Sequence, residues 1–342
     1  MSKPRIAVAS LGGTITMTSE RTNGAAIRPD LDVDALLSAV PSLAGVANLV
    51  TRTLATKPGA SLNFHDISES LKWARAAVAH GARGAVIVQG TDTIEETSYL
   101  LDLYWDQSEP LVVTGAMRPP QAESADGPAN LLSSIIVAAS PQSRDLGVLV
   151  IMNDEIHAAS RVRKTNTSKL DAFTSPSFGA LGYVVEGTPT FANRPSRWPS
   201  LVLPDSQPNS RVAMIETYLG DRGELLDLVT SAKFDGVVLA GFGVGHVSSP
   251  LMLSIHNALS AFPIVLASRT GSGTTFSKTY GFSGSEMDLL TCGVIGAGWL
   301  DARKARILLS SLVAANYSRQ DIADEFARRG NNPGGPVSFA SA

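Results

Sequence analysis

Short runs of apolar or neutral residues alternate with amphipathic segments along the first half of the chain. The runs cover residues 6–11, 49–54, 86–89, 110–115 and 147–152. Segments with helical spacing of apolar residues lie between them, at 32–40, 67–79, 95–103 and 130–139. Continuous apolar runs are typical of strands buried on both faces, and repeated strand–turn–helix units predict a mostly parallel sheet with helices on both faces.

The run at 86–89 leads through a glycine into Thr91 and Asp92, which are followed by helix-forming residues. This pattern indicates a buried strand that ends in a tight turn and opens a helix, and ligands bind at such strand ends in open α/β sheets. A simpler interpretation is that these two residues cap the helix and that Glu95 or Glu96 completes a capping box. On this stretch alone, the cap is the favoured interpretation.

Other predicted strand ends also carry hydroxyl groups or a lysine. Thr14 follows two glycines after the first run, Ser61 lies in a turn after the second, and Lys164 lies in a polar stretch after the fifth. A lysine held beside a carboxylate could polarise or deprotonate a hydroxyl, so Thr91, Lys164 and Asp92 could act as a triad without histidine. Taken singly, each residue has a structural explanation: Thr14 as a cap, Ser61 as a turn residue and Lys164 as a solvated charge.

Motifs for several other chemistries are missing from the sequence. The glycines before Thr14 are half of a dinucleotide-binding fingerprint, but no third glycine follows at the right offset. The histidines have no metal-ligand spacing, and the chain has neither a Gly-x-Ser-x-Gly motif nor a Walker lysine loop. We therefore expect no cofactor and no metal.

Composition narrows the class of protein further. With 342 residues, of which 44% are hydrophobic and 17% charged, the chain is expected to be globular. Its formal net charge of −3, without a basic run, argues against nucleic acid or an anionic membrane as a partner. The single cysteine, Cys292, excludes an internal disulfide. No apolar run approaches the ~20 residues that span a bilayer, and the start of the chain lacks a signal-peptide pattern, so we expect a cytoplasmic protein unless a leader was removed.

A shift in composition predicts the domain organisation. Prolines gather with polar residues from about residue 188, which predicts an N-terminal α/β domain over 1–190, a linker over 191–211 and a C-terminal α/β domain over 212–342. In the C-terminal domain, strands are expected at 212–216, 236–241 and 264–268 and helices at 225–230 and 302–315.

Several motifs follow one another in the order found in a known family. They are LGGTI at 11–15, GTDTIEET at 90–97, TGAMRP at 114–119, SADGP at 124–128, VIMND at 150–154, KTNT at 164–167 and KAR at 304–306. Together they resemble the bacterial-type L-asparaginases of the asparaginase/glutaminase family over nearly the whole chain. The resemblance implies an α/β fold with a larger N-terminal, flavodoxin-like, mostly parallel sheet domain and a smaller C-terminal α/β domain. It also implies a homotetramer, a dimer of dimers, whose active sites lie between the N-terminal domain of one subunit and the C-terminal domain of its neighbour.

The same resemblance implies catalytic roles for four residues. Thr14 matches the family's first threonine, the expected nucleophile on the substrate amide carbon, and Thr91 matches the second threonine, which is paired with Lys164. Asp92 matches the carboxylate that binds the substrate α-amino group. The implied steps are acyl-enzyme formation, ammonia release and hydrolysis by water, and the sequence leaves open which threonine attacks.

Substrate-binding roles are implied for an overlapping set of residues. Ser61 matches the serine that holds the substrate α-carboxylate, and Thr91 and Asp92 are also expected to bind substrate. Backbone N–H groups near Thr91 and Ala116 would then stabilise the oxyanion. The expected function is that of an amidohydrolase in asparagine metabolism, whose small-molecule partner is L-asparagine and whose products are L-aspartate and ammonia.

Three positions depart from the family pattern. No tyrosine occurs within residues 15–36, Leu62 stands where a glutamine usually contacts substrate, and Val244 stands where an asparagine is expected. These departures keep two alternatives open: a family member that acts on D-asparagine, glutamine or a modified asparagine, and a non-catalytic amino-acid sensor. The acidic residue donated across the subunit interface is unassigned, and the candidates are Glu286 and Tyr280.

Overall fold

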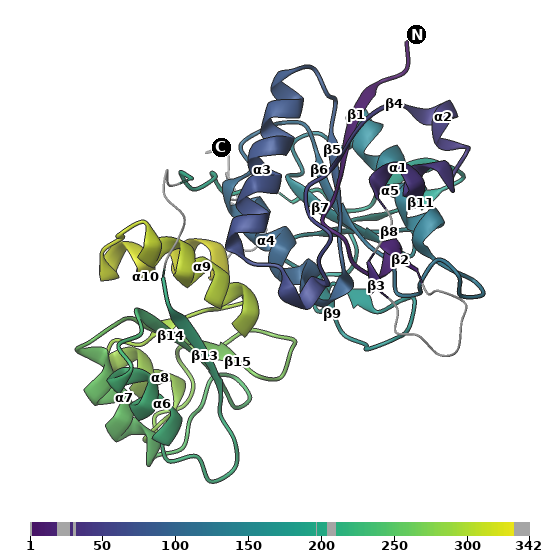
Figure 1. The fold of residues 1–342 in the computed structure, drawn as a ribbon. Helices are drawn as coiled ribbons and strands as arrows, with labels where there is room; N and C mark the ends of the chain where they lie inside the picture. The colour runs from purple at the N-terminus through teal and green to yellow at the C-terminus, as the bar shows by residue number, and fades with distance from the viewer. Residues whose placement is uncertain (1, 19–27, 30–31, 196, 204–209, 332–342) are drawn as a thin grey trace. The chain divides into compact units, whose positions relative to one another are not determined.

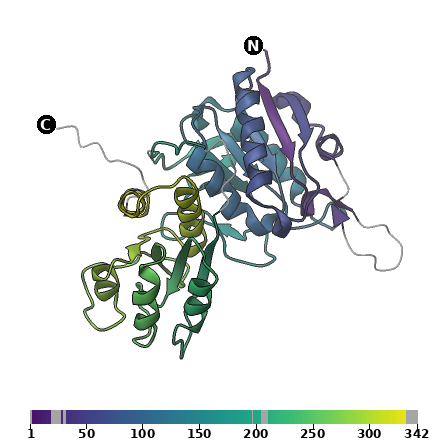
Figure 2. The same cartoon turned by 60° about the vertical axis from the view of Figure 1, so that its left-hand side comes forward.

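The computed structural model describes residues 2–18, 28–29, 32–195, 197–203 and 210–331. The chain falls into two compact units, Met1–Val202 and Leu203–Ala342, each with its own sheet and its own apolar core (Figures 1 and 2). The predicted linker at 191–211 includes residues 196 and 204–209, which lie outside the described residues, so the predicted domain limits stay predictions.

The first unit is built on an eight-stranded sheet of order β12-β11-β8-β7-β6-β5-β1-β4. β1, β4, β5, β6 and β7 are parallel, and β8, β11 and β12 pair antiparallel at one edge. The parallel strands follow the order of flavodoxin-like sheets, which confirms the predicted fold class. Their bounds are β1 (Arg5–Ser10), β4 (Asn48–Thr53), β5 (Ala85–Val88), β6 (Leu111–Thr114) and β7 (Val148–Met152), followed by β8 (Glu155–Ala158), β11 (Gly182–Val185) and β12 (Thr188–Phe191).

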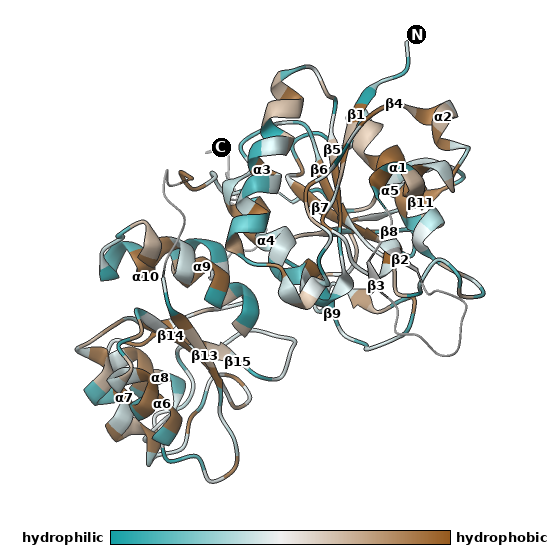
Figure 3. Cartoon of the chain, in the orientation of Figure 1, coloured by the Kyte–Doolittle hydropathy of each residue, from teal (hydrophilic) through white to brown (hydrophobic). Residues whose placement is uncertain are grey.

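Helices cover both faces of this sheet (Figure 1). α3 (Phe64–Ala79) and α4 (Ile94–Tyr104) lie on one face, and α1 (Val33–Ser38), α2 (Leu43–Val46) and α5 (Gly127–Ala139) lie on the other. All residues of β5, β6 and β7 are buried, because the sheet is covered on both sides. Figure 3 accordingly shows hydrophobic colour along the strands and hydrophilic stretches on α3.

The helix predicted at 67–79 begins earlier, at Phe64, because a capping box precedes it. The side chain of Asn63 accepts a hydrogen bond from the backbone N–H of Asp66 at 3.1 Å, and the Asp66 carboxylate accepts one from the backbone N–H of Asn63 at 3.1 Å. Such reciprocal bonds satisfy donors that a helix start leaves unpaired. The turn before this helix, the 3₁₀ turn Gly59–Ser61, is thereby held in a fixed relation to it.

The turns after β1, β4 and β5 meet at glycines. A Cβ added to Gly13 would lie 2.1 Å from the nitrogen of Gly90, and one added to Gly59 would lie 2.9 Å from the carbonyl oxygen of Gly90. Gly13 also has a φ of 92°, which residues with a side chain rarely adopt. Glycine at these positions therefore lets three strand ends touch where the order of the parallel strands reverses, the usual ligand-binding place of such sheets.

The apolar pattern does not predict the antiparallel parts of the first unit. One is the β8–β11–β12 edge, and Phe191 at the end of β12 is also the first residue of the predicted linker. The others are two-residue pairings of β2 (Met17–Thr18) with β3 (Arg28–Pro29) and of β9 (Arg163–Lys164) with β10 (Phe173–Thr174). Segments this short leave no periodic signal, since a period of two needs several residues to be seen.

The second unit holds a four-stranded parallel sheet of order β13-β14-β15-β16. Helix α9 packs against β13, β14 and β15, and α6 and α7 contribute to the apolar cluster with the same strands. The predicted elements are present as β13 (Val212–Glu216), β14 (Gly236–Gly241), β15 (Ile264–Ser268), α6 (Glu224–Ser231) and α9 (Ala302–Ala314). The sequence pattern did not indicate α7 (Leu251–Leu259), α8 (Glu286–Thr291), β16 (Ile295–Gly296) or α10 (Arg319–Asn331).

The glycine contact between the strand ends can be tested by a matched pair of substitutions. Gly13 and Gly81 have nearly the same φ, 92° and 91°, but nothing lies within 4 Å of a Cβ added to Gly81. We expect Gly81→Ala to cost only the backbone penalty, about 1–2 kcal/mol, and Gly13→Ala to cost about 1–3 kcal/mol more, because its methyl group would overlap packed backbone. Urea denaturation of both variants measures the difference, and equal losses would contradict the proposed close contact.

Candidate active site

The turn after β5 presents Thr91 and Asp92 at the start of α4. Thr91 is 6% exposed, and it begins the 3₁₀ turn Thr91–Thr93 that leads into the helix. The residues at the N-cap positions, Gly90 and Thr93, make no side-chain capping hydrogen bond. The interpretation of this stretch as a capping box is therefore wrong, and the side chains at this turn have other partners.

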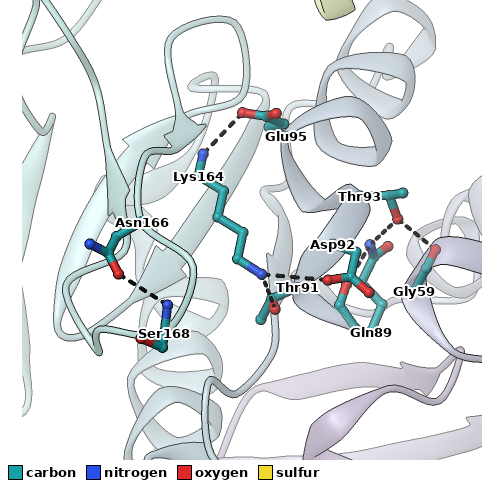
Figure 4. A network of polar contacts seen from close by, with 10 residues as sticks. Gly59, Gln89, Thr91, Asp92, Thr93, Glu95, Lys164, Asn166 and Ser168 are labelled. Carbon is teal, nitrogen blue, oxygen red and sulfur yellow. Dashed lines mark hydrogen bonds and ion pairs between the residues drawn. The ribbon is translucent and has the colours of Figure 1, made fainter.

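Lys164 is the shared partner of this turn (Figure 4). Its Nζ donates a hydrogen bond to Thr91 Oγ1 at 2.8 Å and lies 3.5 Å from Asp92 Oδ1. Its backbone N–H donates to Glu95 Oε2 at 2.9 Å. The lysine side chain is 18% exposed and that of Asp92 is 58% exposed, so the amine is partly shielded from water while the carboxylate faces outward.

Thr14 is brought close to this turn by a backbone contact of the residue before it. It begins the 3₁₀ turn Thr14–Thr16 after β1, and the preceding residue, Gly13, touches Gly90, the residue before Thr91. Thr14 is partly exposed. A hydrogen bond within this turn stabilises it, because the buried hydroxyl of Thr16 donates to the carbonyl oxygen of Gly13 at 2.8 Å. The two threonines expected to be catalytic thus follow glycines that are in contact.

Ser61 is brought to the same edge of the sheet. It ends the turn Gly59–Ser61 and is exposed. Thr93 ties this turn to the one after β5, because its hydroxyl donates to the carbonyl oxygen of Gly59 at 3.1 Å and accepts from Gln89 Nε2 at 3.3 Å. Ser61 can therefore offer a hydroxyl to a ligand beside Asp92 without breaking any of these supporting bonds.

Ala116 follows β6 and lies next to the same turn. It is buried, and a Cβ added to its neighbour Gly115 would lie 2.5 Å from the carbonyl oxygen of Gln89. The loop after it is held by Asp126, whose carboxylate accepts from the backbone N–H groups of Met117 and Arg118, both at 2.9 Å. Asp126 occurs in one of the family motifs, but its role could not be predicted from the sequence, because only the fold brings its carboxylate to the backbone of this loop.

The candidates in the second unit are already engaged with one another. Glu286 is fully buried; its Oε1 accepts from the backbone N–H groups of Thr279 and Tyr280 at 2.9 and 2.8 Å, and its Oε2 lies 3.2 Å from His246 Nε2. Tyr280 is exposed and packs its ring edge-to-face with that of His246. Burial alone would raise the pKa of Glu286, but these hydrogen bonds hold it below its ordinary value. Glu286 therefore stabilises its own loop.

Among the described residues, the cysteine and the possible metal ligands offer no second site. Burial raises the pKa of the Cys292 thiol, which disfavours the thiolate that a nucleophile needs. Within the part of the chain that the structure describes, no group of three or more His, Cys, Asp or Glu side chains could hold a metal ion. Among the same residues, no helix is both long enough and apolar enough to cross a membrane.

Comparison with known proteins gives one consistent result. Residues 5–197 match the family model described as "Asparaginase, N-terminal", and residues 211–326 match "Glutaminase/Asparaginase C-terminal domain". A curated relative from Haemophilus influenzae, "Probable L-asparaginase periplasmic", is 33% identical over 319 residues, 90% of this chain and 87% of that protein. "L-asparaginase 2" of Escherichia coli is 30% identical over 95% of this chain and 93% of that protein. The crystal structure of a probable cytoplasmic L-asparaginase from Campylobacter jejuni aligns with a TM-score of 0.84 at 30% identity, over 95% of this chain and 99% of that one.

The buried carboxylate of Glu286 predicts a pH dependence of stability. Its pKa is lower in the folded chain than the ordinary 4.5, so its contribution is fully present above pH 4.5 and is lost as the pH falls through the folded value. We expect Glu286→Gln to be less stable than wild type at pH 6 and the gap to narrow toward pH 3. Urea denaturation across this range measures the gap. The control is Glu216→Gln, which changes an exposed glutamate; a gap for Glu286→Gln that stays constant with pH would contradict the assignment.

Proposed function

This chain belongs to the asparaginase/glutaminase family, and we propose that it is an amidohydrolase that converts L-asparagine to L-aspartate and ammonia. The observation that carries the proposal is the 2.8 Å hydrogen bond between Lys164 Nζ and Thr91 Oγ1, with Asp92 beside it. This bond pairs a hydroxyl with a group that can move a proton, as acyl transfer requires. Its place at the switch point of the sheet supports the same function.

The chemistry is proposed to run through a threonine ester. The Thr14 hydroxyl oxygen attacks the amide carbon of the substrate side chain and loses its proton, the C–N bond breaks, and the amine leaves as ammonia after taking up a proton. Water then attacks the ester carbonyl, releases the product carboxylate and restores the Thr14 hydroxyl. Thr91 and Lys164 assist the proton transfers, and Lys164 can accept a proton only while its amine is neutral.

A second assignment of the nucleophile is favoured by a different observation. Thr91, unlike Thr14, has a lysine amine within hydrogen-bonding distance, and a nucleophile close to its base is the usual arrangement in covalent catalysis. In that case Thr91 forms the ester and Thr14 assists. Trapping the acyl-enzyme and locating the added mass by peptide mass spectrometry distinguishes the two, since the ester can be on only one threonine.

Substrate recognition is proposed to rest on groups that the fold leaves accessible. The outward-facing carboxylate of Asp92 binds the α-amino group, and the exposed hydroxyl of Ser61 binds the α-carboxylate. Backbone N–H groups near Thr91 and Ala116 stabilise the oxyanion. The replacement of family residues by Leu62 and Val244 keeps another amide, such as D-asparagine, glutamine or a modified asparagine, as the alternative substrate. A non-catalytic sensor is disfavoured, because binding alone needs no lysine on Thr91.

Ammonia release from a panel of amides, with single and double variants, tests this function. We expect wild type to act on L-asparagine faster than on D-asparagine or glutamine, and Thr14→Ala and Thr91→Ala each to lower kcat by roughly 10³-fold or more. The double variant should lose little beyond either single one, because the residues act as a unit. Thr188→Ala, which removes an exposed hydroxyl from the edge strand β12, is the control. Release of no ammonia from any amide, with tight binding by calorimetry, would instead establish a sensor.

We also propose a homotetramer, a dimer of dimers, and a cytoplasmic location. Three leucines of the second unit are strongly exposed, Leu219 at 97%, Leu253 at 71% and Leu228 at 64%, and exposed apolar groups often mark protein contacts. For location, one similar solved structure is that of a probable cytoplasmic L-asparaginase, and one curated relative is a probable periplasmic L-asparaginase, so fractionation of expressing cells is the direct test.

If the chain forms a tetramer, substitutions at the subunit contact should lower the mass of the particle in solution. Light scattering of wild type should give about four times the mass of one chain, and Leu253→Glu together with Leu228→Glu should lower it if these side chains are buried between copies. Lys72→Glu, which changes an exposed residue of the first unit, is the control. An active wild-type monomer would remove both the tetramer and any requirement for a shared site.

A further inference from the structure

One side chain outside the expected site acts on Lys164 from the other end. Glu95 is 4% exposed and lies in the first turn of α4, four residues after Thr91, so the two share a face of the helical segment. Thr91 accepts the hydrogen bond of Lys164 Nζ, and Glu95 accepts that of the Lys164 backbone N–H. A single face of one helix start therefore holds both ends of the lysine (Figure 4).

The strand that carries Lys164 cannot fix its position alone. β9 has two residues, and its pairing with β10 consists of Lys164 opposite Phe173 and Arg163 opposite Thr174. Isolated two-stranded pairings are marginal in water. The bond to Glu95 connects this pairing to α4, which packs on the central strands β6 and β7, so the lysine backbone is attached to a rigid part of the first unit.

We propose that Glu95 is a positioning residue that sets the distance between Lys164 Nζ and Thr91 Oγ1. Its acceptor oxygen fixes where the lysine backbone lies, and the extended side chain then reaches the threonine. This inference rests on the proposed function for its catalytic consequence only, since the hydrogen bond itself is a property of the folded chain. Withdrawing the acceptor would let the backbone of β9 shift and would lengthen the Nζ–Oγ1 contact.

A competing explanation is that Glu95 acts through its charge on the Lys164 amine. Two conservative substitutions separate the explanations. Glu95→Gln keeps an oxygen acceptor at the same reach and removes the charge, whereas Glu95→Asp keeps the charge and withdraws the acceptor by one methylene group. A positioning role predicts that Glu95→Asp is the damaging change, and a charge role predicts that Glu95→Gln is.

The experiment measures lysine acetylation and ammonia release on the same samples of full-length protein. Acetylation at Lys164 is quantified by peptide mass spectrometry against exposed Lys72, and urea denaturation followed by far-UV circular dichroism checks that the first unit stays folded. With Glu95→Asp we expect Lys164 acetylation to rise several-fold and kcat to fall roughly 10- to 100-fold with KM nearly unchanged, because a small misplacement of a catalytic group is costly. With Glu95→Gln both values should stay within about threefold of wild type.

Matched controls decide the outcome. Glu96→Asp makes the same change at the adjacent residue, about 100° away around the helix axis, and should leave Lys164 acetylation unchanged. If Glu95→Asp unfolds the first unit, Glu95→Leu, which has an apolar side chain of similar size and no hydrogen-bond acceptor, replaces it. Two outcomes would overturn the positioning role. One is a folded Glu95→Asp variant whose Lys164 acetylation and kcat equal those of wild type, and the other is a larger loss of kcat with Glu95→Gln than with Glu95→Asp. If wild type released no ammonia, the proposed function would fail, and the acetylation contrast would still decide whether Glu95 positions the lysine.

Discussion

The contact between Gly13 and Gly90 is the constraint on which the site depends. It brings the turns after β1 and β5 to backbone contact, where the two strands are neighbours in the sheet and their connections leave on opposite faces. A side chain at Gly13 would overlap the backbone of Gly90 and push the following residues, Thr14 and Thr91, apart, and one at Gly90 would overlap Gly59. Parallel strands explain why these polar residues share an edge of the sheet, but only the absence of a side chain at Gly13 explains how the backbone before Thr14 comes into contact with the backbone before Thr91.

A lysine can replace the imidazole of other acyl-transfer sites only if its position is held closely. Its side chain has four rotatable bonds, so an unrestrained lysine is a poor partner for one particular hydroxyl. In this chain the restraint comes from both ends, through Thr91 at Nζ and Glu95 at the backbone. The partial burial of Lys164 adds to the effect, since an amine shielded from water interacts more strongly with its neighbours than a solvated one.

Much of the first unit follows from its sequence, because buried parallel strands leave continuous apolar runs that end in glycine. The runs at 86–89 and 110–115 were sufficient to predict β5 and β6. By contrast, the β9–β10 pairing is too short to leave a pattern, although it carries Lys164. Within the second unit, α7 has a short, mostly apolar stretch around Met252 and Ile255 that does not distinguish a short helix from a strand.

The site residues were also predictable to different degrees, because only some of them lie next to a strong local pattern. Thr91 and Asp92 follow a strong strand signal, and motif resemblance indicated the partnership with Lys164. The local pattern at Glu95 favoured a helix-capping role, whereas the structure shows a hydrogen bond to a distant strand. The choice between them depends on a backbone N–H that is 69 positions away in the sequence, and a local pattern contains no information about it.

The arrangement of carboxylates also constrains how an amino group could be recognised. Glu286 has both oxygens engaged, one by two backbone N–H groups and the other by His246. Releasing it to bind a ligand would break these bonds and leave a buried charge without partners, which is costly. Asp92 is exposed, and its contact with Lys164 is a looser 3.5 Å ion pair. A cationic group can therefore approach Asp92 at small cost, and its arrival would leave Lys164 to interact chiefly with the hydroxyl of Thr91.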